Sequence, residues 1–205
     1  AKSPPFHSGL LATCRNGQVS FNVRPQMRKI LLCQLQKIRT ASDAEHRQWM
    51  DAVDWVKSGL PLFRLERPAT PPKHLVSYFP VIDEQYILLV DHKNAKRWLP
   101  TGGHVEDGED PRMTVVRELK EELGLEVSLS ELDAPLMVSV TETVGLTKGH
   151  TDVSLWYPVR RSRHSLVTFD DSEFNSIRWF HFSEVPLGSS DPNLGQFLKK
   201  LQAEA

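Results

Sequence analysis

Hydrophobic residues recur with a helical period in the first third of the chain and with a strand-like period beyond it. The apolar positions of residues 28–39 fit one face of an amphipathic helix. A second helix is predicted to begin after Ser42, because Ser42 and Glu45 have the spacing of a capping box, and to end near Gly59. Two consecutive amphipathic helices predict a helical hairpin. The side chains expected to face the core are Ile30, Leu31, Leu35 and Ile38, followed by Trp49, Met50, Val53 and Val56.

A proline-rich connection follows the hairpin and is the best candidate for a domain boundary. It runs from Arg67-Pro68 to Pro71-Pro72-Lys73. We therefore expect an accessory, largely helical region at 1–66 and a second domain at 67–205. The hairpin could serve dimerisation or substrate specificity, and the sequence leaves its role open. Residues 19–23, before the hairpin, alternate and predict a short strand.

Beyond the boundary, apolar runs between turn-forming residues predict a series of strands. The runs at 74–82 and 86–91 are joined by Asp83-Glu84-Gln85, which indicates a hairpin. A terminal helix is predicted to start around Asp191-Pro192. Strands and helices in this order indicate an α/β or α+β sandwich. Further strands are expected at 97–99, 136–141, 151–160 and 176–182, and the buried residues of the terminal helix at Leu194, Phe197, Leu198 and Leu201.

The most informative stretch runs from Gly102 to Leu125. Asp110 followed by Pro111 predicts the N-cap and first residue of a helix. Gly124 stands where a left-handed residue ends a helix. At 100° per residue, four apolar side chains fall on one side of this helix and are expected to face the core. They are Met113, Val116, Leu119 and Leu123.

Three glutamates are expected to share the other side of the same helix. Glu118 lies three residues before Glu121 and four before Glu122, so their carboxylates should lie within one turn. Neighbouring carboxylates repel, so a cation should accompany them, and Arg117 can hold one. With no histidine or cysteine in this face, the remaining charge favours hard Mg²⁺ or Mn²⁺ over Zn²⁺. A solvated acidic face is the alternative, but the glycine pair and Glu109 would then be coincidences.

The whole stretch resembles the Nudix box, G-x5-E-x7-R-E-U-x-E-E-x-G-U with U aliphatic, and matches it at every specified position from Gly103 to Leu125. The resemblance covers roughly residues 70–205. It implies the Nudix fold, a mixed β-sheet sandwiched between helices, and metal-dependent hydrolysis of a diphosphate linkage. By matched position it implies Glu118 and Glu122 as the main metal ligands and Glu121 as a further ligand or catalytic base. Arg117 would orient the glutamates, and Glu109 would brace the loop or reach the metal through water.

Residues around the glycines are candidates for substrate binding. Gly102 and Gly103 would let the backbone approach the ligand without a Cβ in the way. His104 could donate a hydrogen bond to a phosphate, or it could stabilise its own turn. Thr101 departs from the proline that many Nudix members carry here. Nudix enzymes often present a further acidic residue from a later loop, and Glu173 in the segment 170–173 is the best placed.

Three other groups have both a functional and an ordinary interpretation. His150-Thr151-Asp152 could touch substrate, or Asp152 could cap a strand. Trp98 and Trp156 could stack a base, although strand tryptophans pack in cores more often. The basic segment 160–164 is better explained as a solvated loop than as a phosphate-steering patch.

Composition narrows the class of protein further. The 205 residues are 40% hydrophobic and 25% charged, and the net charge of −1 gives no reason to expect nucleic-acid binding. Cys14 and Cys33 are too few for a disulfide framework. No apolar run has membrane-spanning length, and no signal-peptide pattern is seen, so we expect a cytoplasmic protein without membrane partners.

Together with these observations, the Nudix resemblance implies a hydrolase that uses two or more Mg²⁺ (or Mn²⁺) ions to cleave a nucleoside diphosphate joined to another group. Glu121 or a downstream loop acid would act as general base. Both (d)NTP and ADP-ribose-like substrates stay open, as does a homodimer. The alternative is a catalytically silent Nudix-fold sensor or regulator. It is less favoured because every carboxylate of the box is present and the N-terminal helices lack the basic face that DNA binding needs.

Overall fold

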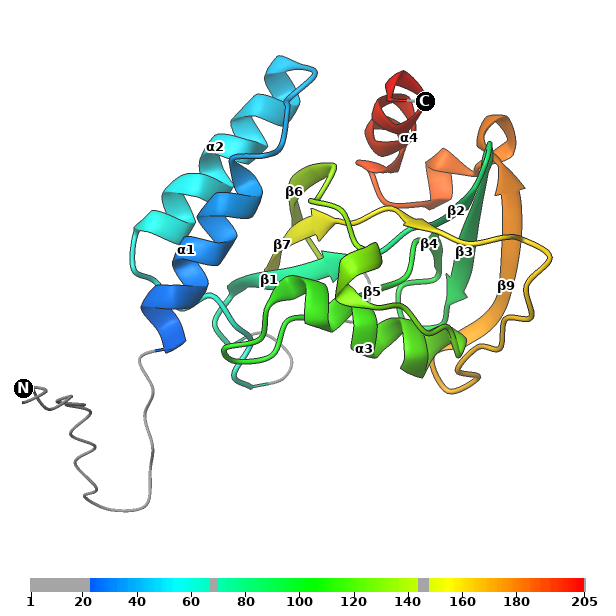
Figure 1. Ribbon diagram of the computed structural model, residues 1–205, viewed down its shortest axis with the longest axis horizontal. Helices are drawn as coiled ribbons and strands as arrows, with labels where there is room; N and C mark the ends of the chain where they lie inside the picture. The colour runs from blue at the N-terminus through cyan, green and yellow to red at the C-terminus, as the bar shows by residue number, and fades with distance from the viewer. Residues whose placement is uncertain (1–22, 67–69, 144–147, 205) are drawn as a thin grey trace, which may run out of the picture.

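Two mixed β-sheets flanked by α-helices form the part of the chain that the computed structural model describes, residues 23–66, 70–143 and 148–204 (Figure 1). β1 pairs in parallel with β7, and β2 in parallel with β8, while the remaining pairs are antiparallel. This arrangement confirms the predicted fold class. The first sheet has the order β5 (Gly102–His104), β1 (Lys73–Tyr78), β7 (Thr151–Trp156), β6 (Met137–Glu142). The second has the order β4 (Arg97–Leu99), β3 (Tyr86–His92), β2 (Val81–Asp83), β8 (Val159–Arg160), with β9 (Phe174–His181) also paired to β3.

A proline divides each of the two longest predicted strands. The strand predicted at 74–82 breaks at Pro80 into β1 and β2, and the one predicted at 151–160 breaks at Pro158 into β7 and β8. Proline has no N–H to donate to the hydrogen bonds of a sheet, so each of the two segments leaves the first sheet at its proline and enters the second. The prediction of continuous strands was wrong at these points. Because β1 pairs with β7 and β2 with β8, the two crossings lie side by side.

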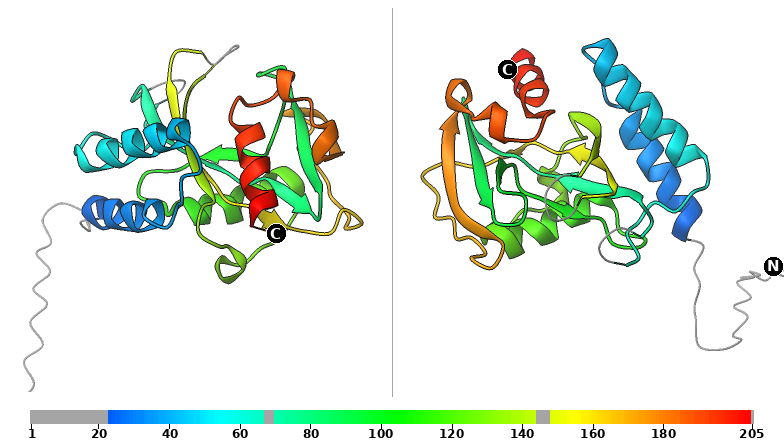
Figure 2. Two further views of the ribbon diagram at one scale, coloured as in Figure 1. Left: turned by 90° about the horizontal axis from the view of Figure 1, so that it is seen from above. Right: turned by 180° about the vertical axis from the view of Figure 1, so that it is seen from behind.

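Helices α1 (Val23–Leu35) and α2 (Asp43–Lys57) form the predicted hairpin beside the first sheet (Figures 1 and 2). Ser42 caps α2 as predicted, because its hydroxyl accepts a hydrogen bond from the Glu45 N–H at 3.2 Å. The Glu45 carboxylate accepts from the Ala41 N–H at 2.7 Å and also pairs with buried Lys200. The hairpin belongs to the same buried cluster as the sheet. That cluster includes Leu31, Leu35, Trp55 and Val56 from the hairpin and Leu75, Val138, Val153 and Leu155 from the strands.

The hairpin differs from its prediction in two details. α1 occupies 23–35 rather than 28–39, and the strand predicted at 19–23 lies outside the described residues except for Val23, which begins α1. Met50 is 42% exposed although it was expected in the core. The buried side of α2 runs through Glu45, Ala52, Val53 and Val56, at helical spacings i, i+7, i+8 and i+11, and Met50 lies beyond its edge.

Helix α3 (Pro111–Leu123) carries the three glutamates and lies against β1 and β5 (Figure 1). Its ends are as predicted: the Asp110 side chain accepts from the Arg112 N–H at 3.0 Å, and Gly124 has a left-handed φ of +64°. The buried face is rotated from the predicted one, so Met113 is exposed and Val116 is only partly buried. The residues on the buried face are Pro111, Thr114, Val115, Leu119, Glu122 and Leu123.

Helix α4 (Leu194–Ala203) closes the second hydrophobic cluster above the sheets (Figure 1). All four residues predicted to be buried there are buried, and they pack with Trp156. Among the described residues, no helix is long and apolar enough to cross a membrane. The division into a region 1–66 and a domain 67–205 remains a proposal.

Candidate functional site

A cavity of about 890 Å³ opens between the two sheets, beside the glycine loop, residues 100–106. One wall carries the carboxylates of α3, and another carries polar residues of β1, β5 and β7. The cavity therefore brings together side chains that are far apart in the sequence. Of the predicted site residues, those lining it are Gly102, Gly103, His104, Arg117, Glu118, Glu121, Glu122 and Glu173.

The glycine loop packs directly onto a carboxylate of α3. A Cβ added to Gly103 would lie 2.3 Å from Oε1 and 2.5 Å from Cγ of Glu118. A Cβ at Gly102 would lie 2.2 Å from the ring of Tyr78. Only glycine allows the short strand β5 to approach both side chains so closely. The loop thus fixes the position of the Glu118 side chain beside the cavity.

Arg117 contacts three carboxylates of the site. Its guanidinium donates to Glu109 at 3.1 and 3.2 Å and to Glu118 at 2.6 Å, and it lies 3.7 Å from Glu121. Partial burial opposes the charge of Arg117, but these hydrogen bonds raise its pKa above the ordinary value. Burial likewise acts to raise the pKa of Glu109, yet hydrogen bonds from Arg117, the Glu106 N–H and Thr114 bring the pKa below its usual range.

Glu122 is the most unusual group in the site. The residue is only 6% exposed, and its Oε2 has no hydrogen-bond partner in the described part of the chain. Burial raises the pKa of Glu122 well above its ordinary value, and the neighbouring charges of Glu118 and Glu173 raise it further. We expected all three glutamates on the solvent face of α3, and this was wrong for Glu122, which completes the buried stripe three residues after Leu119.

A cation would resolve this accumulation of negative charge. The pKa of Glu118 is also raised, first by burial and then by Glu121 and Glu173, although Arg117 acts to lower it. Burying a carboxylate without a partner is costly, so its oxygen needs a positive charge nearby. The donor set is made of carboxylate oxygens, which suit hard divalent cations. Glu121 is 62% exposed at its side chain, so it reaches the cavity from the solvent side.

The later acidic loop is held against the end of α3. The Asp170 N–H donates to the Glu122 carbonyl at 3.0 Å, and the Thr168 N–H donates to the Leu123 carbonyl at 3.2 Å. Glu173 lines the same cavity as the carboxylates of α3, and its charge acts on Glu122. Asp170 acts on Glu122 electrostatically but does not line the cavity.

His104 and Asp152 do not have the local roles that we considered for them. The Arg64 guanidinium lies 3.1 Å from Nε2 of His104, forty residues away in sequence, so His104 does not merely stabilise its own turn. Burial and then the charge of Arg64 lower the pKa of His104 to about 3, so the imidazole is neutral. Asp152 lies inside β7 rather than at its end and points to the same side as His150.

Other candidates have structural contacts. Trp156 is fully buried and donates from Nε1 to Ser139 at 2.8 Å, while Trp98 packs edge-on against Phe180. In the basic segment, Arg161 donates to Glu131 at 3.0 Å and Arg163 lies 3.5 Å from an oxygen of Asp83. These contacts agree with the ordinary interpretation of the two tryptophans and of the basic segment.

The sequence analysis missed His74 and Arg64 as site residues. His74 was counted only as the first residue of a strand, yet it is fully buried beside Asp152 because β1 pairs in register with β7. The pairing joins two segments that lie far apart in the sequence. The local sequence carries no signal for such a distant contact.

The mixed sheets, the glycine loop and the carboxylate-bearing helix define the Nudix class of proteins. Residues 72–201 match the family model described as NUDIX domain. Since the match spans more than half of the chain, the chain belongs to the NUDIX family, whose hydrolases generally use divalent metals.

Solved structures support the same fold. A NUDIX-family hydrolase from Clostridium perfringens is 21% identical with a TM-score of 0.50, over 64% of this chain and 97% of that chain. The E. coli dihydroneopterin triphosphate pyrophosphohydrolase is 16% identical with a TM-score of 0.50, over 68% and 99%. The NUDIX domain of Shewanella oneidensis NrtR, complexed with ADP ribose, is 16% identical with a TM-score of 0.50, over 72% and 91%.

Proposed function

We propose that this protein is a divalent-metal-dependent hydrolase that cleaves the diphosphate linkage of a nucleoside diphosphate derivative. The observation that carries the proposal is the buried Glu122 carboxylate, which has an oxygen without a hydrogen-bond partner and lies beside other carboxylates. Membership in the NUDIX family supports hydrolysis of phosphoric anhydride bonds. A cavity of about 890 Å³ has room for a nucleotide-sized ligand.

Glu118 and Glu122 would hold the cation, Mg²⁺ or Mn²⁺, with Glu121 as a further ligand. When bound, such a cation would neutralise the charge of the diphosphate and act as a Lewis acid. Arg117 is assigned a positioning role, since its hydrogen bonds to Glu109 and Glu118 hold the Glu118 side chain against Gly103. Glu109 in turn braces Arg117 and the preceding loop.

Two carboxylates can accept the proton of the attacking water. Glu121 is the most exposed glutamate of α3, and Glu173 lines the same cavity. Both assignments remain open. A pH–rate profile of Glu121→Gln and of Glu173→Gln separates them, because loss of the base removes the acidic limb while loss of a ligand raises the metal concentration required.

The substrate class is proposed from the charge of the site and from the neighbours of the fold. Carboxylates that hold a divalent cation favour a di- or triphosphate group. ADP ribose, which is bound to the NUDIX domain of NrtR, and dihydroneopterin triphosphate, the substrate named for the E. coli enzyme, are the first compounds to test. Deoxynucleoside triphosphates complete the set.

The test is a product screen by ³¹P NMR with Mg²⁺ and with Mn²⁺ on the full chain. We expect cleavage of at least one diphosphate compound by wild type and by Glu126→Gln, and loss of cleavage in Glu122→Gln. Glu126 is the matched control because it is exposed and pairs with Lys120 outside the cavity. Binding of a compound without any cleavage would contradict the proposal and favour the ligand-sensor alternative.

A further inference from the structure

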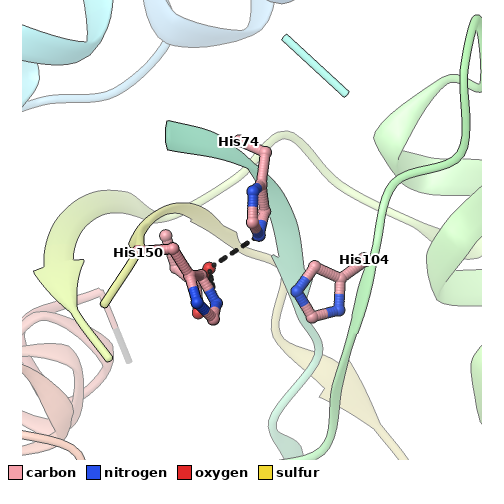
Figure 3. A group of neighbouring side chains, drawn as sticks. His74, His104 and His150 are labelled. Carbon is pink, nitrogen blue, oxygen red and sulfur yellow. Dashed lines mark ion pairs between the residues drawn. The ribbon is translucent and has the colours of Figure 1, made fainter. Parts of the chain in front are cut away.

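A second cluster of metal-type side chains lies on the wall of the cavity formed by the first sheet (Figure 3). It consists of His74, His104, His150 and Asp152, whose candidate ligand atoms all lie within 4.8 Å of one another. His74 on β1 is directly opposite Asp152 on the parallel strand β7, and His150 precedes Asp152 by two residues, so all three share one face of the sheet. His74 is fully buried.

The hydrogen bonds around the cluster fix where its protons lie. Nδ1 of His74 is 2.9 Å from the Pro71 carbonyl, which only accepts, so in the neutral ring Nδ1 carries the proton and Nε2 has a lone pair. Nδ1 of His150 is 3.2 Å from Thr143 Oγ1, and that hydroxyl donates to the His150 carbonyl at 3.1 Å. In the tautomer in which Oγ1 accepts from Nδ1–H, Nε2 of His150 also has a lone pair.

Both lone pairs point at the same carboxylate oxygen. Oδ1 of Asp152 lies 3.3 Å from Nε2 of His74 and 3.4 Å from Nε2 of His150. Within the described residues, neither Oδ1 of Asp152 nor Nε2 of His74 has a hydrogen-bond partner, because the ion-pair distances lack hydrogen-bond geometry. Two buried acceptor atoms without a hydrogen-bond partner among the described residues thus meet beside the His150 ring. Such an arrangement is unfavourable unless a cation lies between them.

We propose that His74, His150 and Asp152 bind a zinc-type divalent transition metal, at a site separate from the glutamates of α3. Metal bonds of about 2.0–2.1 Å in a tetrahedron place neighbouring ligand atoms about 3.3–3.4 Å apart. The distances at Asp152 have these values. The His74 ring, anchored through Nδ1 to a backbone carbonyl, has the second hydrogen bond typical of metal-bound histidine.

His104 borders this site without being a ligand in the present arrangement. A guanidinium only donates, so Nε2 of His104 accepts from Arg64 and the proton of its neutral ring is on Nδ1. His104, His150 and Asp152 all line the cavity. The fourth coordination position therefore faces the cavity, where water or an anionic group of a ligand can enter.

The two proposed sites differ in the metals that they prefer. Two imidazole nitrogens and one carboxylate favour Zn²⁺ and other first-row transition metals, whereas the oxygen-only set of the α3 glutamates favours Mg²⁺. In saturating Mg²⁺, Zn²⁺ binding that is kept in Glu122→Gln and lost in Asp152→Asn therefore reports on the histidine site. This inference does not depend on the proposed hydrolase activity.

The experiment is a Zn²⁺ titration of the EDTA-treated full chain in excess Mg²⁺, followed by calorimetry, with Co²⁺ absorption as a second readout. We expect one Zn²⁺ per chain in wild type, in Glu122→Gln and in His164→Gln, a histidine outside the cluster. Asp152→Asn and His74→Gln should bind Zn²⁺ more weakly by about 100-fold or more. Unchanged affinity in Asp152→Asn, or loss of Zn²⁺ in Glu122→Gln, would overturn the proposal.

Asp152→Asn also tests the apo cluster, and it retains the shape of the side chain. An asparagine N–H can donate to the lone pairs of His74 and His150, which a carboxylate cannot do. The variant should therefore melt at a higher temperature than wild type in EDTA and gain nothing from Zn²⁺. If it melts lower in EDTA and wild type shows no Zn²⁺ binding, the cluster is a protonated imidazole–carboxylate pair and not a metal site.

Discussion

Replacing Gly103 with alanine should disable the site while leaving the fold intact. The added Cβ would lie 2.3–2.5 Å from Oε1, Cδ and Cγ of Glu118, whereas carbon contacts are comfortable only beyond about 3.5 Å. The Glu118 side chain must therefore move by about 1 Å. A displacement of that size can cost about 100-fold in rate when the group positions the reaction. Because a side chain and not the backbone gives way, we expect only a small change in the free energy of unfolding.

The assay compares kcat/KM at several Mg²⁺ concentrations with the midpoint of urea unfolding. Gly195→Ala is the matched control, since its Cβ would meet only Leu187 at 3.4 Å, on helix α4. We expect this control to keep wild-type activity. If Gly103→Ala keeps kcat/KM within a few-fold of wild type, the position of Glu118 does not matter to the reaction, and the reasoning fails. A loss of activity accompanied by unfolding would also refute it.

Two further predictions concern stability. Asp110→Ala removes the N-cap of α3 and should lower the free energy of unfolding by about 0.5–2 kcal/mol at neutral pH. Burial acts to raise the pKa of Asp110, but its hydrogen bonds with Arg112 bring the pKa below the ordinary value. The difference in the free energy of unfolding between wild type and variant, measured by urea unfolding, should therefore shrink as the pH falls through that lowered pKa and persist at higher pH. A chain that begins at Arg67 should lose stability relative to the full chain, because deletion of the hairpin removes its apolar side chains from the cluster that they share with Val138 and Leu155. An unchanged thermal midpoint would show that the hairpin is an independent unit.

Local signals in the sequence predicted the ends of α3 well. The Asp110 cap and the left-handed Gly124 depend only on neighbouring residues, and both are confirmed. The rotation of the buried face was missed because Met113 is as apolar as Val115, so periodicity alone could not choose between two overlapping stripes. Thr114 and Glu122, both polar, occupy buried positions: the Thr114 hydroxyl donates to Glu109, and Glu122 lines the cavity.

The parts of the site that sequence could not predict depend on strand pairing. The placement of His74 beside Asp152 follows from the register of β1 and β7, and the contact of Arg64 with His104 follows from the path of the chain before β1. The two prolines that switch the strands between sheets carried a usable signal. Pro80 and Pro158 stand inside runs that were read as single strands, and proline inside a strand argues against continuity.

The central claim is that a divalent cation binds between Glu118 and Glu122, and paired thermal melts in Mg²⁺ and in NaCl of matched ionic strength test it most directly. Mg²⁺ at ten times its Kd should stabilise wild type by about 1.4 kcal/mol. For a chain of this size that corresponds to roughly 3–6 °C. Glu122→Gln, which removes a buried negative charge, should melt at least as high as wild type in EDTA and show no specific response to Mg²⁺. Equal Mg²⁺ shifts in both proteins, or shifts that NaCl reproduces, would contradict the claim.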